Sequence, residues 1–185
     1  MSPSNAKPRV LIVDDHHANL AAFRTVLEDD FAIHAVDSGE RALELTLKMD
    51  FAVILLDVRM PGMSGFEAAE LMRKRDKLRF TPIIFTSAFD QTLENMTRGY
   101  VAGATDFLFS PVEPDLLKLK VATYSQTYLR NETLRLQIDQ LTAMLQDLRA
   151  ELTKRGLAEN GLKARIRELD EAVGRLRRQA EVAPY

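Results

Sequence analysis

Three aspartates and two serines have the residue types and spacing of a phosphoryl-transfer site. Asp14 and Asp15 follow one apolar run, Asp57 follows another, and Ser87 and Ser110 follow two later runs. Carboxylates brought together raise one another's pKa unless a cation joins them. Oxygen ligands of this kind suit Mg²⁺, and a carboxylate beside Mg²⁺ can attack phosphorus. If the fold gathers these side chains, we expect the two hydroxyls to face phosphoryl oxygens.

The elements that must position these residues alternate between strand and helix. Apolar runs at 9–13, 31–36, 52–56, 82–86 and 106–109 alternate with helical stretches at about 17–28, 39–49, 65–76 and 91–101, and a fifth helix begins near Pro114. Continuous apolar strands between helices indicate a parallel sheet covered on both faces. We therefore predict an α/β fold, a doubly wound five-stranded parallel sheet, with its site at the carboxyl ends of the strands.

Two plainer interpretations apply to parts of this pattern. Single aspartates after strands are common turn formers, so a solvated acidic rim is the alternative to a metal site. His16 and His17 follow the acidic pair and are also possible metal ligands. Adjacent residues at a helix start point in different directions, which favours a solvated helix entry for these histidines.

The motifs VLIVDD, LLDVRMPGMSG, PIIFTSA and GATDFLFSPVEP together resemble the receiver domain of bacterial two-component response regulators, over about residues 8–125. The resemblance implies a flavodoxin-like fold, bound Mg²⁺, and a histidine kinase or phosphotransfer protein as phosphodonor. It also implies a phospho-acceptor rather than an enzyme with a separate output domain.

Matching positions assign the acidic residues. By this resemblance Asp57 is the phospho-acceptor and a metal ligand. Asp15 binds Mg²⁺ directly, Asp14 assists through water, and the backbone carbonyl of Arg59 completes the metal contacts. An aspartyl-phosphate hydrolase is a different reading, but it needs a second catalytic acid two residues beyond Asp57, where this chain has Arg59.

The remaining assigned positions include one departure from the family pattern. Ser87 stands at the switch hydroxyl and Phe107 at the switch aromatic. Ser110 stands where the family has a lysine before proline, so the site loses a cation. One interpretation is that phosphorylation survives at a lower rate. The other is a phosphorylation-independent pseudo-receiver that acts as a dimerisation and partner-binding module.

A second segment, residues 126–185, has the pattern of a long coiled-coil helix. Apolar residues recur at a and d positions for about seven heptads, among them Ile138, Leu141, Leu145, Val173 and Leu176. Such a helix has no intrachain partner for its apolar stripe. We therefore expect a homodimer through a parallel coiled coil, with Asn131 able to fix the register.

The segment Lys154–Gly161 interrupts this stripe with two glycines and charged residues at core positions. It fits either a hinge in a continuous coil or the turn of a helical hairpin. The heptad frame is the same on both sides, since Leu152 and Ile166 lie 14 residues apart. A hairpin does not need that agreement, which favours the continuous coil.

The composition of the chain narrows the classes of protein to which it could belong. The chain has 185 residues, no cysteine and a net charge of −2, which excludes disulfides and gives no reason to expect nucleic acid. The longest strongly apolar stretch, 51–56, is too short to span a bilayer. We expect a cytoplasmic protein made of a receiver at 1–125 and the coil. Either the chain is a fragment that lacks an output domain, or the coil is itself the output. A purely structural dimerisation module is the competing possibility.

Overall fold

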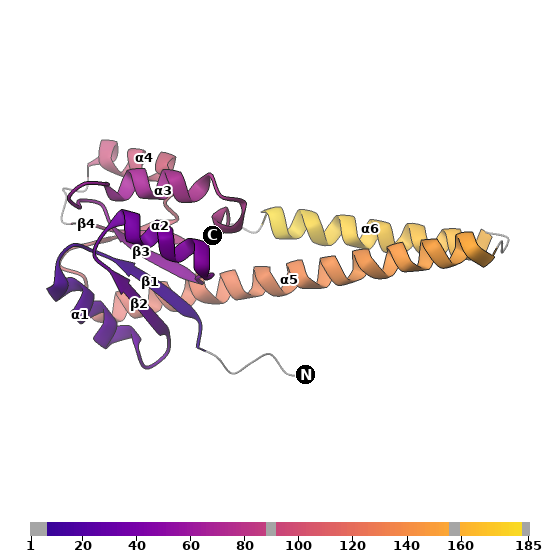
Figure 1. The fold of residues 1–185 in the computed structure, drawn as a ribbon, viewed down its shortest axis with the longest axis horizontal. Helices are drawn as coiled ribbons and strands as arrows, with labels where there is room; N and C mark the ends of the chain where they lie inside the picture. Colours follow the sequence, from indigo (N-terminus) through magenta and orange to yellow (C-terminus); the bar gives the residue numbers. More distant parts are fainter. Residues whose placement is uncertain (1–6, 88–91, 156–159, 183–185) are drawn as a thin grey trace. The chain divides into compact units, whose positions relative to one another are not determined.

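The computed structural model describes residues 7–87, 92–155 and 160–182. Five strands and six α-helices alternate along it (Figure 1). They are β1 (Arg9–Val13), α1 (His17–Leu27), β2 (Ala32–Val36), α2 (Gly39–Lys48), β3 (Val53–Asp57), α3 (Gly65–Arg73), the short 3-10 helix η1 (Asp76–Leu78), β4 (Ile83–Ser87), α4 (Leu93–Ala102), β5 (Asp106–Phe109), α5 (Pro114–Arg155) and α6 (Asn160–Val182).

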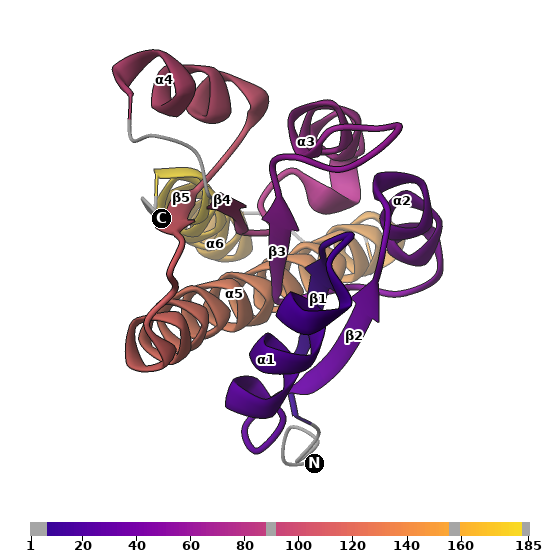
Figure 2. The same ribbon diagram turned by 90° about the vertical axis from the view of Figure 1, so that its left-hand side faces the viewer.

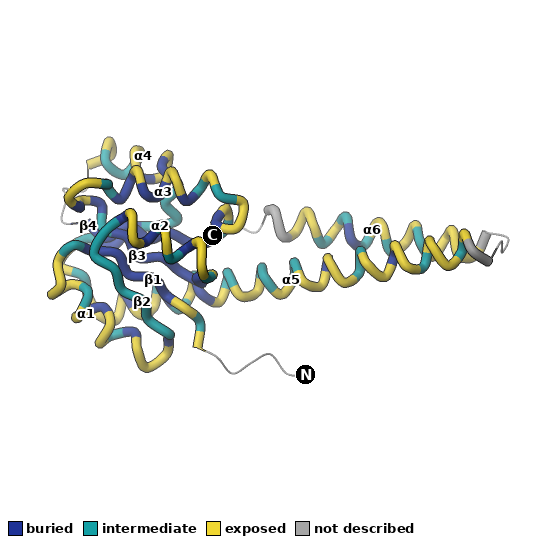
Figure 3. Tube along the Cα trace, viewed as in Figure 1, coloured by how far each residue is buried: buried dark blue, intermediate teal, exposed yellow. Residues whose placement is uncertain are grey.

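The strands form one parallel sheet in the order β2-β1-β3-β4-β5. Helices α2, α3 and α4 cover one face, while α1 and the start of α5 cover the other (Figure 2). The central strands β1, β3 and β4 are largely buried because both faces of the sheet are covered, and they are dark in Figure 3, whereas the edge strand β2 is half-buried. The order reverses between β1 and β3, which places the ends of these two strands side by side at the switch point.

The predicted α/β fold is confirmed. Every predicted strand is present, and the bounds differ from the prediction by at most one residue. β3 extends one residue further, to Asp57, because Asp57 pairs with Thr86 of β4. β4 extends one residue further, to Ser87, because Ser87 pairs with Phe109 of β5. The predicted helix at 65–76 ends at Arg73 and continues as the separate turn η1.

The chain divides into two compact units, Met1–Tyr128 and Leu129–Tyr185. Within the second unit, α5 and α6 share an apolar core of Ile138, Leu145 and Val173, with Leu141, Ile166, Leu169 and Leu176 packed against it. An ion pair between Arg149 and Asp170 also joins the two helices. This unit is a helical hairpin.

The preference for a continuous parallel coil is therefore corrected. The core residues are those that the heptad pattern selects, but α6 of the same chain covers the stripe of α5. The premise that the stripe lacks an intrachain partner was wrong, because Ile166, Leu169, Val173 and Leu176 of α6 pack against Ile138 and Leu145 of α5. Residues 156–159, which are half of the predicted interruption, lie outside the described residues.

None of the described helices is both long enough and apolar enough to cross a membrane.

Candidate functional site

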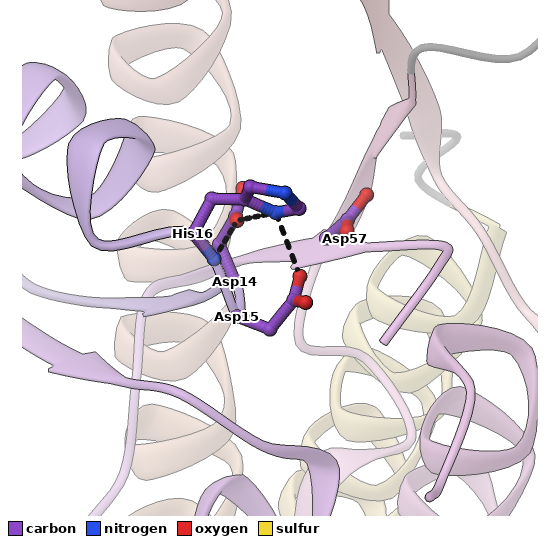
Figure 4. A group of neighbouring side chains, drawn as sticks. All are labelled: Asp14, Asp15, His16 and Asp57. Carbon is purple, nitrogen blue, oxygen red and sulfur yellow. Dashed lines mark hydrogen bonds and ion pairs between the residues drawn. The ribbon is translucent and has the colours of Figure 1, made fainter. Parts of the chain in front are cut away.

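The three aspartates predicted from the sequence meet at the carboxyl ends of β1 and β3. Asp14 and Asp15 directly follow β1, and Asp57 is the last residue of β3, opposite Thr86 of β4. Together with His16 they each offer one ligand atom, and these atoms lie within 4.8 Å of one another (Figure 4). This arrangement of oxygen donors fits a hard divalent cation such as Mg²⁺.

Asp14 is the most deeply buried of the three, with 2% of its surface exposed. Its carboxylate accepts hydrogen bonds from the His16 backbone N–H at 2.8 Å and from Asn19 Nδ2 at 2.9 Å. These two hydrogen bonds hold the carboxylate at the N-terminal end of α1 and compensate the free-energy cost of burying it. Sequence reasoning did not identify Asn19, although its place in the first turn of the helix after Asp14 and Asp15 was a usable signal.

The loop after Asp57 is fixed at both ends. Val58 N–H donates to Thr86 O at 3.1 Å, and Gly65 N–H donates to Val58 O at 3.0 Å. A Cβ at Gly65 would lie 2.1 Å from the Asp57 carbonyl oxygen, so only glycine permits this approach. Ser64 then starts α3 with a capping box to Glu67. These contacts fix both ends of the loop that carries Arg59 relative to Asp57.

Ser87 and Ser110 lie at the ends of the two neighbouring strands, as predicted. The Ser110 N–H donates to Ser87 O at 2.9 Å, and the Ser110–Pro111 peptide bond is cis. A cavity of about 390 Å³ is lined by both serines and by Asp14, His16, Asp57 and Arg59, among others. No lysine is among the described residues that line it. The residue that the sequence resemblance places at the family's lysine position is thus short and neutral, and it lines this cavity.

Phe107, the predicted switch aromatic, is buried, with its ring beneath α4. A Cβ at Gly99 would lie 2.2 Å from the Phe107 ring, so glycine at this position of α4 makes room for the ring. Phe109 stacks on the same ring, and Tyr100 meets it edge-on. The ring is held inside an aromatic cluster in this conformation.

The electrostatics of the site single out Asp57. Burial raises the pKa of its carboxyl from the ordinary 3.8 to about 6, and the negative charge of Asp14, then that of Asp15, acts in the same direction. Hydrogen bonds from the backbone of Arg59 and Val58 lower this pKa but do not cancel the rise. A site of this kind favours either protonation of Asp57 or a bound cation.

The raised pKa predicts a pH-dependent stability that Asp57→Asn should remove. Between about pH 4 and pH 6 the folded protein keeps a proton that the unfolded chain has lost, so the free energy of unfolding falls as pH rises. Because Asp57 is partly exposed, we expect the asparagine variant to gain only about 1 kcal/mol above pH 6, and nothing below pH 4. Urea unfolding without divalent cations, repeated across this pH range, measures the free energy of unfolding of both proteins. If this free energy changes with pH in the same way in the wild type and in Asp57→Asn, the raised pKa assigned to Asp57 is wrong.

Comparison with known proteins decides the family. The sequence model of the response regulator receiver domain family matches residues 10–122, more than half of the chain. The chain belongs to this family. Its acidic pocket lies where receiver domains bind Mg²⁺, and the donor set at Asp14, Asp15 and Asp57 fits that ion.

Individual relatives agree with the assignment of a receiver. The two-component response regulator ORR11 of rice (Oryza sativa subsp. indica) is 36% identical over 111 residues, which are 59% of this chain and 75% of that protein. The sensor histidine kinase GacS of Pseudomonas protegens is 35% identical over 132 residues, 70% of this chain but only 14% of that protein. The solved structure of the chemotaxis protein CheY4 of Vibrio cholerae has a TM-score of 0.62 and 31% identity, and it covers 64% of this chain and 99% of that one.

Proposed function

We propose that this receiver accepts a phosphoryl group on Asp57 from a histidine kinase or phosphotransfer protein and signals through α5 to the helical hairpin. The observation that carries the proposal is the convergence of Asp14, Asp15 and Asp57. Asp14 and Asp57 line one cavity together with the hydroxyl-bearing residues Ser87 and Ser110. The test is a gain of one phosphoryl group at Asp57, dependent on Mg²⁺ and detected by mass spectrometry.

The chemistry assigned to these residues is a direct phosphoryl transfer. A carboxylate oxygen of Asp57 forms the bond to phosphorus while the bond from phosphorus to the donor nitrogen breaks, and the departing imidazole takes the electron pair. Asp15, Asp57 and the Arg59 carbonyl would hold Mg²⁺, with Asp14 assisting through water, and the bound ion would supply positive charge to the phosphoryl oxygens. The Ser87 hydroxyl then contacts one of those oxygens.

Contacts between β5 and α5 support a route out of the site. Lys120 Nζ donates to Asp106 Oδ2 at 2.6 Å and to Phe107 O at 3.0 Å. The Tyr124 hydroxyl donates to the same Asp106 oxygen at 2.9 Å. α5 is thus attached to the backbone of the switch aromatic, so a movement of Phe107 is passed to this helix.

The alternative function is a phosphorylation-independent pseudo-receiver. Ser110 favours it, because the described lining of the cavity offers no lysine where the family has one. In this alternative the first unit is a rigid platform and the hairpin binds a partner without a phosphoryl signal. Failure of Asp57 to take up phosphate, with Mg²⁺ and a small phosphodonor present, would favour it.

We also propose that the protein associates with itself through the surface of the hairpin, rather than through the parallel coiled coil expected from the sequence. On α5, Leu136 and Met144 are 63% and 66% exposed, and Leu129 is 44% exposed. Leu129 and Leu136 lie seven residues apart on one face of α5, and Leu129 lies nine residues before Ile138, about two and a half helical turns, so this stripe faces away from Ile138 of the hairpin core, with Met144 at its edge. A second copy of the hairpin offers an identical apolar stripe to cover it.

Replacing both Leu136 and Met144 with glutamate should therefore shift the protein from dimer to monomer in sedimentation. The two side chains are exposed in the single chain, so the hairpin should keep its helical circular dichroism. The control is Gln137→Glu with Gln146→Glu, which adds the same charge at exposed polar positions of α5. Dimerisation through this stripe is wrong if the wild type is monomeric, or if the leucine and methionine variant still dimerises.

A further inference from the structure

The His16 side chain faces the acidic site rather than bulk solvent alone. Its Nδ1 lies 2.9 Å from Asp15 Oδ1 and 3.6 Å from Asp14 Oδ1 (Figure 4). Its backbone N–H is held by Asp14 Oδ1 at 2.8 Å, which anchors the residue at the start of α1. The sequence prediction of a solvated helix entry for His16 describes its exposed edge but not the direction of Nδ1.

The spacing of these atoms suits a common metal ion. Metal–ligand distances of about 2.0–2.2 Å place neighbouring ligands of an octahedral ion about 3 Å apart and opposite ligands about 4.2 Å apart. The separation of His16 Nδ1 from Asp15 Oδ1 matches a neighbouring pair. The ligand atoms of Asp14, Asp15, His16 and Asp57 all lie within 4.8 Å of one another, close to the separation of opposite ligands on one ion.

The chemistry of an imidazole donor changes which ions bind best. Mg²⁺ prefers oxygen ligands and gains little from a nitrogen donor, whereas Mn²⁺, Co²⁺, Ni²⁺ and Zn²⁺ accept imidazole readily. Affinity for a mixed nitrogen and oxygen site rises from Mn²⁺ to Ni²⁺. A fourth protein ligand at His16 therefore adds more affinity for Ni²⁺ or Zn²⁺ than for Mg²⁺.

We propose that His16 Nδ1 is an additional ligand at the Asp57 site, which makes this receiver bind imidazole-accepting transition metal ions in preference to Mg²⁺. The inference rests on the metal site of the proposed function, but it concerns the choice of ion and not the phosphoryl transfer. It assigns to the residue after the acidic pair a role that the family resemblance does not give it.

His17 provides a matched comparison within the same chain. It is also exposed and lies one residue further along, yet it is absent from the set of donors at the site. Instead it is close enough to Asp37, the residue after β2, for its charge to act on that carboxylate. The two histidines therefore share residue type and exposure at the start of α1, and differ in the carboxylates that they face.

Isothermal titration calorimetry of the untagged full chain tests the proposal, with Mg²⁺, Mn²⁺ and Ni²⁺ titrated into the wild type, His16→Ala and His17→Ala. Loss of even an outer partner of a metal ligand costs about 10- to 100-fold in metal affinity. We expect His16→Ala to weaken Ni²⁺ binding by about tenfold or more and Mg²⁺ binding by much less. His17→Ala should bind all three ions as the wild type does.

Nitrogen NMR of the histidine rings gives a second measurement. Zn²⁺, which is diamagnetic, should shift the Nδ1 resonance of His16 strongly, while Mg²⁺ should not. The proposal is wrong if Ni²⁺ affinity is unchanged in His16→Ala, or if Ni²⁺ and Mg²⁺ affinities fall equally, since His16 would then only position the carboxylates. Equal losses in the two histidine variants would indicate surface binding and also overturn it.

These titrations use no phosphodonor. A protein that binds Ni²⁺ through His16 but never labels Asp57 would keep this inference and lose the proposed function. A protein that takes up phosphate on Asp57 but binds Ni²⁺ equally well without His16 would keep the proposed function and lose this inference.

Discussion

Replacing Asp57 with asparagine should abolish phosphoryl uptake by this protein. With Mg²⁺ and a small phosphodonor such as acetyl phosphate, the wild type should gain the mass of one phosphoryl group, and Asp57→Asn should gain none. The reason is that the amide lacks the carboxylate oxygen that attacks phosphorus. The variant should fold, because the substitution removes a partly buried negative charge that Asp14 and Asp15 already disfavour. Intact-protein mass spectrometry measures the result.

Asp50→Asn is the matched control, because Asp50 is an exposed aspartate before the opposite end of β3. It should label as the wild type does, and omission of Mg²⁺ should prevent labelling of both. Equal labelling of Asp57→Asn and the wild type would place the acceptor elsewhere. Labelling that persists without any divalent cation would contradict the role given to Asp14 and Asp15.

The fold could be predicted from the sequence because its signals are local and agree with one another. A run such as Val53–Leu56, apolar at every position, needs cover on both faces, and helices between such runs supply it. Once the sheet is parallel, Asp14, Asp15 and Asp57 must lie at the same edge. Their convergence therefore followed from strand order and needed no side-chain detail.

Other parts of the site depend on geometry that spacing alone does not contain. Asn19 reaches Asp14 because α1 starts at His17 and turns this side chain back toward the strand end. The direction of His16 Nδ1 depends on the backbone at the helix N-cap, where adjacent residues diverge. The room for the Phe107 ring depends on Gly99, which the sequence places in a helix with no indication of what lies beneath it.

The C-terminal hairpin shows a different limit. The heptad pattern correctly selected Ile138, Leu145 and Val173 as core residues. An apolar stripe specifies that a partner helix exists, but it does not specify whether that helix belongs to the same chain. The unchanged heptad frame across the interruption favours a continuous helix, yet two halves that each carry an apolar stripe also pair as a hairpin.

Replacing Ser110 with lysine should speed phosphoryl uptake at Asp57. Ser110 lines the cavity that contains Asp57, and no lysine is among the described residues around it. A lysine from this position brings an ammonium group to the phosphoryl oxygens, where charge neutralisation supplies much of the rate. One well-placed charged donor is worth about 10²-fold or more, so the initial rate of labelling with acetyl phosphate should rise measurably even with imperfect geometry.

Ser110→Met separates charge from length, because methionine extends into the same cavity without a cation, and it should leave the labelling rate near that of the wild type. The added lysine should also strengthen the response of residues 106–128 to beryllofluoride in hydrogen exchange, since Ser110 lies between β5 and the α5 helix that Lys120 and Tyr124 attach to it. If Ser110→Lys changes neither the labelling rate nor this exchange pattern, the missing cation does not limit the site. If the lysine variant labels and the wild type does not, Ser110 is the residue that makes this chain a pseudo-receiver.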